Sequence, residues 1–502
     1  MLRRTLAILL AAFTAASAAG DNPETITERS QDRARAVLDR AVEANGGAAA
    51  LRAVRSVRLQ LDGETLPRFQ MTTPDPPFEG GRLQETLLVD LENNRMRLDQ
   101  RTGGFGFEGN ITIAITGGQG SNYDHRARTV TPIPAAQATQ QQFIQYYRRL
   151  PNLLLRQALD RQNTLRHLGE ESFQGRRHDV ITFVMPDTVQ VSAFVDAATG
   201  LVSKYELIFV DPLTGVEASE ILYGDYRKVG DYQVPSTFTN MQAGDVVATF
   251  ALRAELNPAI SDDSFKVAAE GYRQVSPAPT DFPQSVETLA PGVHLIRNYS
   301  GQNQNTIAVE FADHVVALEA PGTSEGADTV IARIKELAPG KPIRYVAMTH
   351  HHGDHMGGIR SFIAEGATVV TTPGNRGVVE RMAAAAQNDR LSRNPRKPEF
   401  MFIEGGRRVL KDATRTLELI DIGPNPHARE MVIAWLPKEK VVYQGDLFFV
   451  PANDAPFGPP QASTASFAQK LRALDLPYER IASVHGATAT RAQFEQATAD
   501  VR

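Results

Sequence analysis

The 502-residue chain contains no cysteine. Disulfide bonds and thiolate metal ligands are therefore excluded, and so is a lipid anchor attached to an N-terminal cysteine. The formal net charge is only −5, so the composition favours neither nucleic acid nor an anionic membrane surface as a partner. Beyond residue 20, no apolar stretch approaches the length of a membrane-spanning helix, and we expect no integral membrane span. The chain is long enough for two or more domains, each with its own core.

The first 20 residues have the composition of a secretory signal peptide. Met1–Arg4 is short and basic, Thr5–Ala16 is apolar, and Ala16–Ala18 has the A-x-A form of a cleavage site. The apolar run is too short for a comfortable membrane span, although an uncleaved anchor is the alternative. We therefore expect residues 1–20 to be removed and the mature protein to be periplasmic or secreted. N-terminal sequencing of exported protein tests this expectation.

Residues 21–275 are predicted to form an α+β domain built on a curved antiparallel sheet. The apolar spacing in residues 27–45 predicts a helix, which Gly46 and Gly47 end, and a second short helix is expected at 48–54. Alternating polar and apolar residues then recur, as is typical of antiparallel strands with one solvated face. A leucine-rich helical segment, 137–162, interrupts them. The predicted strands are 57–61, 84–89, 110–115, 179–184, 190–195, 201–210, 217–226, 232–238 and 246–252.

This region also contains short sequence motifs, such as Glu43-Ala-Asn-Gly-Gly47 and the stretch from Tyr226 to Pro235. The arrangement resembles the periplasmic carriers of the lipoprotein-localisation type, which are half-barrels that hold acyl chains. The resemblance implies a lipid or another apolar ligand for the N-terminal domain. A structural or oligomerisation domain is the alternative, because a fold does not by itself imply a function.

A proline-rich segment, Ser276–Pro283, is the clearest linker, and we place the linker at residues 276–285. Residues 286–502 then alternate between strands and helices. Strands are predicted at 291–296, 305–310, 314–318, 345–348 and 368–371, and a helix at 328–337.

The loop after the strand at 345–348 contains a dense set of metal ligands: His350, His352, Asp354 and His355. These four fall within six residues of a chain that has only 11 histidines. Residues two apart in an extended loop project to the same side, so His350 and His352 can hold one ion together. Asp354 and His355, on a helix expected to run to Ile363, can face a second ion. Imidazole and carboxylate ligands together favour zinc or a similar divalent ion, although such a loop can also bind metal adventitiously.

Residues 349–358 read T-H-x-H-x-D-H-x-G-G and resemble the signature of the metallo-β-lactamase-fold hydrolases. The resemblance implies an α/β fold for residues 286–502, the four-layer αββα sandwich, and three further ligands. His427 fits the third ligand of the first metal, beside His350 and His352. His485 fits the last ligand of the second metal, beside Asp354 and His355. Asp446 fits the carboxylate that bridges both metals.

The resemblance further implies an exported hydrolase with two Zn²⁺ ions, although iron or manganese is also compatible with this ligand set. A metal-bound hydroxide, oriented by Asp354 as the catalytic residue, would attack an ester, thioester, lactone or amide-type bond of a small-molecule substrate. An aspartate at 446, where thiolate-ligated β-lactamases have cysteine, favours the broad hydrolase branch over true β-lactamases. Two alternatives stay open: an apolar-ligand carrier with an inactive hydrolase-like domain, and a mononuclear iron sulfur dioxygenase on the same fold.

Expectations also follow for other residues near these motifs. His351 is expected to point away from the metals and to lie behind the ligands or at the surface. Glu319 begins Glu-Ala-Pro-Gly where many relatives have Asp-Thr-Gly, so the support behind the ligands is expected to differ. Asn375, Arg376 and the segment 450–460 are candidates for substrate contacts. No motif selects one substrate.

Overall fold

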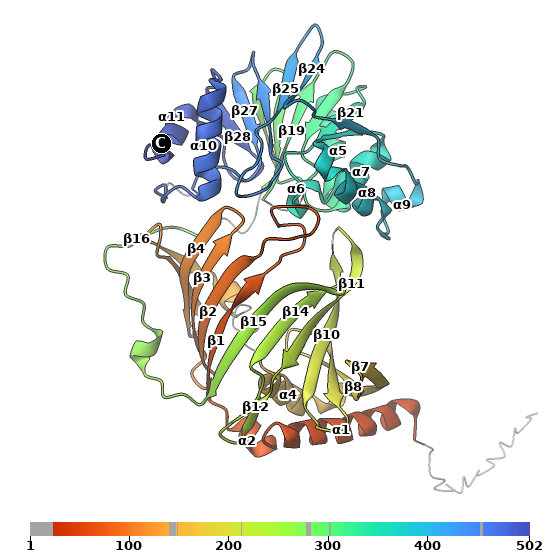
Figure 1. Ribbon diagram of the computed structural model, residues 1–502, viewed down its shortest axis with the longest axis vertical. Helices are drawn as coiled ribbons and strands as arrows, with labels where there is room; N and C mark the ends of the chain where they lie inside the picture. The colour runs from red at the N-terminus through yellow and green to blue at the C-terminus, as the bar shows by residue number, and fades with distance from the viewer. Residues whose placement is uncertain are drawn as a thin grey trace, which may run out of the picture.

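A computed structural model describes residues 24–139, 147, 149–211, 213–277, 283–300, 303–451 and 455–501. The predicted signal peptide and part of the predicted linker lie outside the described residues. The chain forms a β-rich N-terminal domain and a C-terminal sandwich of two sheets, stacked one above the other (Figure 1). No helix within the described part of the chain is both long and apolar enough to cross a bilayer.

The N-terminal domain is built on a single curved sheet of fourteen strands (Figure 1). Its strand order is β16-β6-β5-β4-β3-β2-β1-β15-β14-β11-β10-β9-β8-β7, and only the β16–β6 pair is parallel. The strands are β1 (Ser56–Thr65), β2 (Gly81–Asp90), β3 (Arg95–Gly104), β4 (Phe107–Thr116), β5 (Gln119–Asp124), β6 (Thr129–Ile133), β7 (Arg166–Phe173), β8 (Arg176–Val184), β9 (Gln190–Asp196), β10 (Val202–Asp211), β11 (Gly215–Gly224), β14 (Thr237–Gln242), β15 (Asp245–Leu256) and β16 (Arg273–Gln274). Along β1 the buried Val57, Leu59 and Leu61 alternate with more exposed residues, which is the expected antiparallel pattern.

Among the described residues, three helices pack against this sheet: α1 (Ile26–Ala44), α2 (Ala48–Arg52) and α4 (Pro151–Asp160). The predicted helix at 27–45 corresponds to α1, which Thr25 and Glu28 begin with a capping box. Of the predicted 137–162 segment, α4 begins at Pro151, because proline suits the first turn of a helix. The remainder of that segment lies partly outside the described residues.

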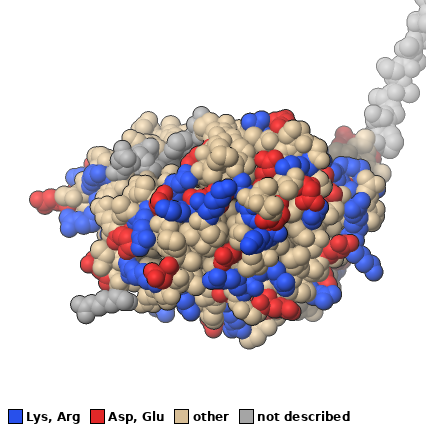
Figure 2. Space-filling view, turned by 90° about the horizontal axis from the view of Figure 1, so that it is seen from above, with Lys and Arg blue, Asp and Glu red and all other residues tan. Residues whose placement is uncertain are grey.

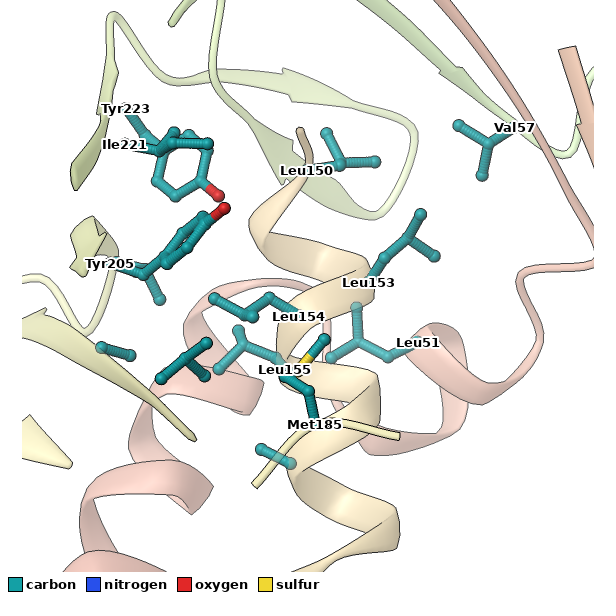
Figure 3. Packing of buried hydrophobic residues seen from close by; sticks show 14 of the residues in the cluster. Leu51, Val57, Leu150, Leu153, Leu154, Leu155, Met185, Tyr205, Ile221 and Tyr223 are labelled. Carbon is teal, nitrogen blue, oxygen red and sulfur yellow. The ribbon is translucent and has the colours of Figure 1, made fainter. Parts of the chain in front are cut away.

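The leucines of α4 fill much of the space between the helices and the sheet (Figure 3). Leu153, Leu154 and Leu155 are almost completely buried, and they pack with Leu51 of α2 and with side chains of the sheet. A void beside Leu154 and Met185 measures only about 10 Å³, which barely holds one water molecule. The described side chains here form a packed core, and the predicted apolar ligand of this domain stays a prediction.

The C-terminal domain has four layers, αββα, as predicted. One sheet contains β17 (Ser285–Ala290), β18 (Val293–Arg297), β19 (Asn305–Glu310), β20 (Val315–Leu318), β21 (Ile343–Ala347), β22 (Thr368–Thr371) and β23 (Phe400–Phe402). The other contains β24 (Arg407–Lys411), β25 (Thr416–Asp421), β26 (Val432–Leu436), β27 (Val441–Gln444), β28 (Arg480–Ser483) and β29 (Ala489–Thr490). The first sheet is covered by α5 (Ser324–Leu337), α6 (Gly353–Met356), α7 (Ile359–Glu365), α8 (Arg376–Ala384) and α9 (Arg390–Arg393), the second by α10 (Ala462–Leu474) and α11 (Arg491–Ala497) (Figure 1). Separate apolar clusters lie between the sheets and under each helical layer.

Two predicted elements are divided in the structure. The helix expected from Asp354 to Ile363 is two helices, α6 and α7, because Gly357 and Gly358 separate them. A Cβ on Gly357 would lie 1.9 Å from the carbonyl oxygen of Gly322, so only glycine allows this close approach. The strand expected at 232–238 is divided at Pro235 into β13 (Tyr232–Val234), which pairs with β12 (Arg227–Val229), and β14. Proline lacks the N–H that a continuous strand pairing requires.

Seen from above the C-terminal domain, acidic and basic side chains are interspersed (Figure 2). The opposite side of this domain is contacted by turns of the N-terminal domain, among them those between β1 and β2, between β3 and β4, and between β10 and β11 (Figure 1). Leu213, from the third turn, is part of the apolar cluster under α5, α7 and α8. The two domains therefore share core packing as well as surface contacts.

Candidate metal centre

The seven predicted metal ligands come together at one edge of the sandwich. Strands β20 and β21 are parallel, as are β27 and β28, so their carboxyl ends meet at this edge. His350, His352, Asp354 and His355 follow β21, Asp446 follows β27, and His485 follows β28. His427 lies in the loop that precedes β26. Segments far apart in the sequence are thus brought into contact, as in the His485–Asp354 pair, for which the separation is 131 residues.

The first cluster consists of His350, His352, His427 and Asp446, and all four are buried. His350 Nε2 lies 3.1 Å from His427 Nε2, and His427 Nε2 lies 3.5 Å from Asp446 Oδ2. The second cluster consists of Asp354, His355, His485 and the same Asp446. His355 Nε2 lies 3.2 Å from Asp446 Oδ1, and His485 Nε2 lies 3.1 Å from Asp354 Oδ2.

These separations suit a divalent ion. Bonds of about 2.0–2.1 Å in a tetrahedral zinc site place neighbouring ligand atoms about 3.3–3.4 Å apart. The spacings of 3.1 to 3.5 Å in both clusters bracket that value. His352 Nδ1, His355 Nε2 and Asp446 Oδ1 are buried and have no hydrogen-bond partner among the described residues. Buried polar atoms are rarely left unpaired, so the donor set fits a divalent cation.

Burial and charge pairing set the protonation of several side chains in the clusters. Burial and the neighbouring imidazoles lower the pKa of His350, and burial lowers the pKa of His352, so both rings are neutral at pH 7. Burial works against the charges of His355 and Asp446. Their mutual attraction outweighs burial, raises the pKa of His355 and lowers the pKa of Asp446. Asp446 therefore presents an anionic carboxylate between the two clusters.

Four of the five imidazoles in the two clusters are oriented by a second contact on the far nitrogen. His350 Nδ1 lies 3.0 Å from the hydroxyl of Thr349, and His485 Nδ1 lies 2.6 Å from the carbonyl oxygen of Asn303. His352 Nε2 donates to the carbonyl of Met71, and His427 Nδ1 donates to the carbonyl of Phe105. Such outer contacts fix the tautomer and orientation of a ligand. Two of them come from the N-terminal domain.

Glu319 supports the second cluster from behind. Its carboxylate accepts a hydrogen bond of 3.1 Å from the Thr349 backbone and lies 3.6 Å from His355 Nδ1. It is completely buried and has a positive φ of 76°, which is uncommon for a residue other than glycine. The departure from the Asp-Thr-Gly turn therefore places a longer carboxylate behind His355.

His351 points away from both clusters, but it is buried rather than exposed. Its Nε2 donates to the same Met71 carbonyl that His352 contacts, and burial lowers the pKa of His351 to about 4. The remaining histidines lie away from the two clusters: His125, His167, His178, His294 and His314.

The predicted substrate-contact residues have other partners. Asn375 is buried and donates to the hydroxyls of Thr371 and Thr372, and Arg376 pairs with Glu380 on α8. Residues 452–454 of the predicted 450–460 segment lie outside the described residues. Residues from the N-terminal domain, which no sequence motif singled out, reach the site instead. They include Gln70, Met71, Phe105 and Phe107.

Gln70 and Phe107 contact ligand side chains directly. The Gln70 amide donates a hydrogen bond of 2.6 Å to Asp354 Oδ1. The Phe107 ring packs edge-on against His427, with ring centroids 5.1 Å apart, and lies 6.3 Å from the ring of Phe449. Neither residue belongs to a sequence motif, so no local signal identifies it.

Comparison with known proteins agrees with the fold of the C-terminal domain. Residues 321–485 match the family model of the Metallo-beta-lactamase superfamily. Similar solved structures include the DIM-1 metallo-beta-lactamase (18% identity, covering 44% of this chain and 97% of that one, TM-score 0.34). Others are the mono-zinc form of FIM-1 from Pseudomonas aeruginosa (21%, 44% and 96%, TM-score 0.32) and a metallo-beta-lactamase from Pontibacter korlensis (16%, 45% and 96%, TM-score 0.31).

No curated protein matches the chain. The family model does not extend over the N-terminal domain, whose resemblance to lipoprotein-localisation carriers is not confirmed. The family match covers the residues from Pro321 to His485, which include every residue of both clusters. The C-terminal domain of this chain therefore matches the Metallo-beta-lactamase superfamily model and has the metallo-β-lactamase fold.

Proposed function

We propose that this protein is a hydrolase that holds two zinc ions. His350, His352 and His427 would hold the first ion, and Asp354, His355 and His485 would hold the second. The observation that carries this proposal is the position of Asp446, which belongs to both clusters. Its Oδ2 faces His427 of the first cluster and its Oδ1 faces His355 of the second.

When bound, two such ions supply a water that ionises near neutral pH and a Lewis acid for the substrate oxygen. The protein supplies the direction of approach. The side chains of Asp354 and His485 are 29% and 22% exposed, whereas those of His355 and Glu319 are completely buried. A substrate therefore reaches the site from the side of Asp354 and His485. Gln70 holds Asp354 Oδ1, so that Oδ2 faces His485 and the second cluster.

Aromatic rings border this approach. Phe449 is 37% exposed and its ring lies 6.1 Å from that of His485. The ring of Phe107 lies near the rings of both Phe449 and His427. These rings favour an apolar group beside the scissile bond, because such a group would cover the aromatic faces and remove them from water. The proposed substrates are therefore esters, thioesters, lactones or amides with an apolar substituent.

Elemental analysis of the purified protein, combined with a hydrolysis screen, tests the proposal. We expect two zinc ions per chain and turnover of at least one ester, thioester, lactone or β-lactam, with phosphodiesters screened in parallel. His352→Ala should lose the first ion and the activity, whereas His294→Ala, which alters a histidine outside the clusters, should lose neither. A single tightly held iron ion, or no hydrolysis by a protein loaded with two ions, would contradict the proposed function.

A further inference from the structure

Two turns of the N-terminal domain lie directly over the clusters. The β1–β2 turn, residues 66–80, places the Phe69 carbonyl 2.8 Å from the Gly353 amide nitrogen and the Met71 carbonyl 2.9 Å from His352 Nε2. The β3–β4 turn places the Phe105 carbonyl 3.1 Å from His427 Nδ1. Both turns therefore end in backbone acceptors that touch the metal-binding loops of the other domain.

The Met71 carbonyl determines which nitrogen of His352 is free. A carbonyl oxygen can only accept, so His352 Nε2 must carry the proton and Nδ1 must carry the lone pair. His352 Nδ1 is buried and has no hydrogen-bond partner in the described part of the chain. In the opposite tautomer, the Met71 carbonyl oxygen would face the lone pair of His352 Nε2, and the first cluster would face the N–H of Nδ1.

The same reasoning applies to His427. Its Nδ1 donates to the Phe105 carbonyl, so its Nε2 carries the lone pair, and this nitrogen is the one that faces His350 and Asp446. Edge-on contact with the Phe107 ring further restricts the imidazole. Two of the three histidines in the first cluster are thus oriented by the N-terminal domain.

We propose that the N-terminal domain orients the side chains that bind metal in the other domain. Its β1–β2 and β3–β4 turns hold His352 and His427 in the tautomers that ligate metal, and Gln70 holds Asp354 for the second ion. Met71, Phe105 and Gln70 are positioning residues in this arrangement. The inference rests on the proposed metal-binding function and assigns to the N-terminal domain a role that does not require a ligand of its own.

The backbone of both turns supports this assignment. Phe69 and Phe105 have positive φ values of 56° and 54°, which are uncommon for large side chains. Such strained backbone conformations persist where contacts with neighbouring residues hold them in place, and they concentrate at functional sites. Each of these two residues supplies a carbonyl that contacts the C-terminal domain.

Gly106 offers a way to move one turn without changing any ligand. A Cβ at this position would lie 2.8 Å from Ser463 Cβ and 3.0 Å from the His427 backbone nitrogen, so Gly106→Ala must push the turn away from His427. Gly118→Ala is a matched control, since Gly118 has φ +78° against +80° for Gly106 and no atom of the described residues lies within 4 Å of where its Cβ would be. Both substitutions place alanine at nearly the same positive φ and strain the backbone to a similar extent, but only Gly106→Ala disturbs the site.

Zinc affinity of the full-length variants, measured by competition with a chromophoric chelator, provides the first test. We expect Gly106→Ala to weaken the first ion about 10- to 100-fold, as loss of an outer contact does in other metal sites, and Gly118→Ala to bind as the wild type does. Gln70→Met, which keeps the length of the side chain without its amide, should weaken the second ion only. Wild-type affinity in both Gly106→Ala and Gln70→Met would overturn the inference.

A second measurement uses the unaltered protein and decides the question if Gly106→Ala does not fold. Nitrogen-15 NMR of the histidine rings in the zinc-loaded chain should show a proton on His352 Nε2 and on His427 Nδ1. A proton on the other nitrogen of either ring would overturn the inference. If the wild type binds no zinc, the proposed function fails as well. If the wild type binds two ions and the variants bind them equally well, only the role of the N-terminal domain is refuted.

Discussion

Asp446 is the residue on which the relation between the two clusters depends. It is buried, and burial alone would raise its pKa, yet His355 and its other imidazole neighbours keep the carboxyl ionised. An anion at this point lies within 3.2 to 3.5 Å of nitrogens from both clusters. Two cations a few Å apart repel strongly, so a shared carboxylate is the natural means of holding both.

Substitutions at Asp446 and Asp354 should therefore differ in their effects. Asp446→Ala should lose metal as well as activity, whereas Asp446→Asn keeps the shape, retains one ion and loses most hydrolysis. Asp354→Asn should keep the first ion, because His350, His352 and His427 remain. Its turnover should fall about 100-fold, as a misplaced reacting group typically causes. Metal content and turnover, measured on the same preparations, check these outcomes. Two retained ions and normal turnover in both Asp446 variants would make Asp446 a structural residue.

At the level of elements, helix α7 is held in place shortly after the loop that contains His350 to His355. Arg360 is only 2% exposed, and its guanidinium donates to both carboxylate oxygens of Asp389, at 2.5 and 2.9 Å. It also donates to the carbonyls of Met382 and Ala383 at the end of α8. The buried ion pair thus connects α7 with the C-terminal end of α8 and with the start of α9.

Removing one partner of this pair should be costly. Asp389→Ala leaves the Arg360 charge buried without its counter-ion, and we expect a loss of about 3–5 kcal/mol in the free energy of unfolding. Glu336→Ala is the control, because it removes the exposed Arg333–Glu336 pair and should cost less than about 1 kcal/mol. Urea denaturation followed by circular dichroism measures both. Equal effects of the two substitutions would show that the buried ion pair contributes no more to the free energy of unfolding than the exposed pair does.

The same ion pair predicts a pH dependence. Burial opposes the Asp389 charge, but the Arg360 hydrogen bonds outweigh it and hold the pKa of Asp389 below its ordinary value of 3.8. The lowered pKa means that the folded state favours the ionised carboxyl, so its contribution is present above pH 3.8 and is lost as the pH falls further. The stability difference between the wild type and Asp389→Asn should therefore shrink below pH 3.8. A difference that grows on acidification would contradict this sign.

For the whole molecule, metal binding and stability should be linked. The unpaired buried nitrogens and oxygens of the two clusters belong to the folded state, so an ion that binds there stabilises that state. Zinc at about 100 times its Kd should raise the free energy of unfolding by about 2.7 kcal/mol relative to the metal-free protein. Calorimetry would show this as a higher Tm. Magnesium is the control, since it prefers oxygen ligands and should bind this imidazole-rich site poorly. An equal rise with magnesium, or none with zinc, would argue against these clusters as the binding site.

Much of the fold could be predicted because its signals are local. The helix at 27–45 and the strands at 305–310 and 368–371 correspond closely to α1, β19 and β22, since apolar spacing records which face of an element is buried. The division of the helix after Asp354 could not be read in the same way. It depends on the approach of Gly322 to Gly357, and helical periodicity carries no information about a distant backbone atom.

The sequence by itself determined the chemistry of the candidate site: the imidazole and carboxylate ligands, their order along the chain and the strand–loop context of His350 to His355. Only the tertiary structure decided what surrounds those ligands. Met71 contacts His352 across 281 positions of sequence, and Phe105 contacts His427 across 322. Both contacts are made by backbone carbonyls, which every residue has. Only the folded chain could therefore place the N-terminal domain beside the metal ligands.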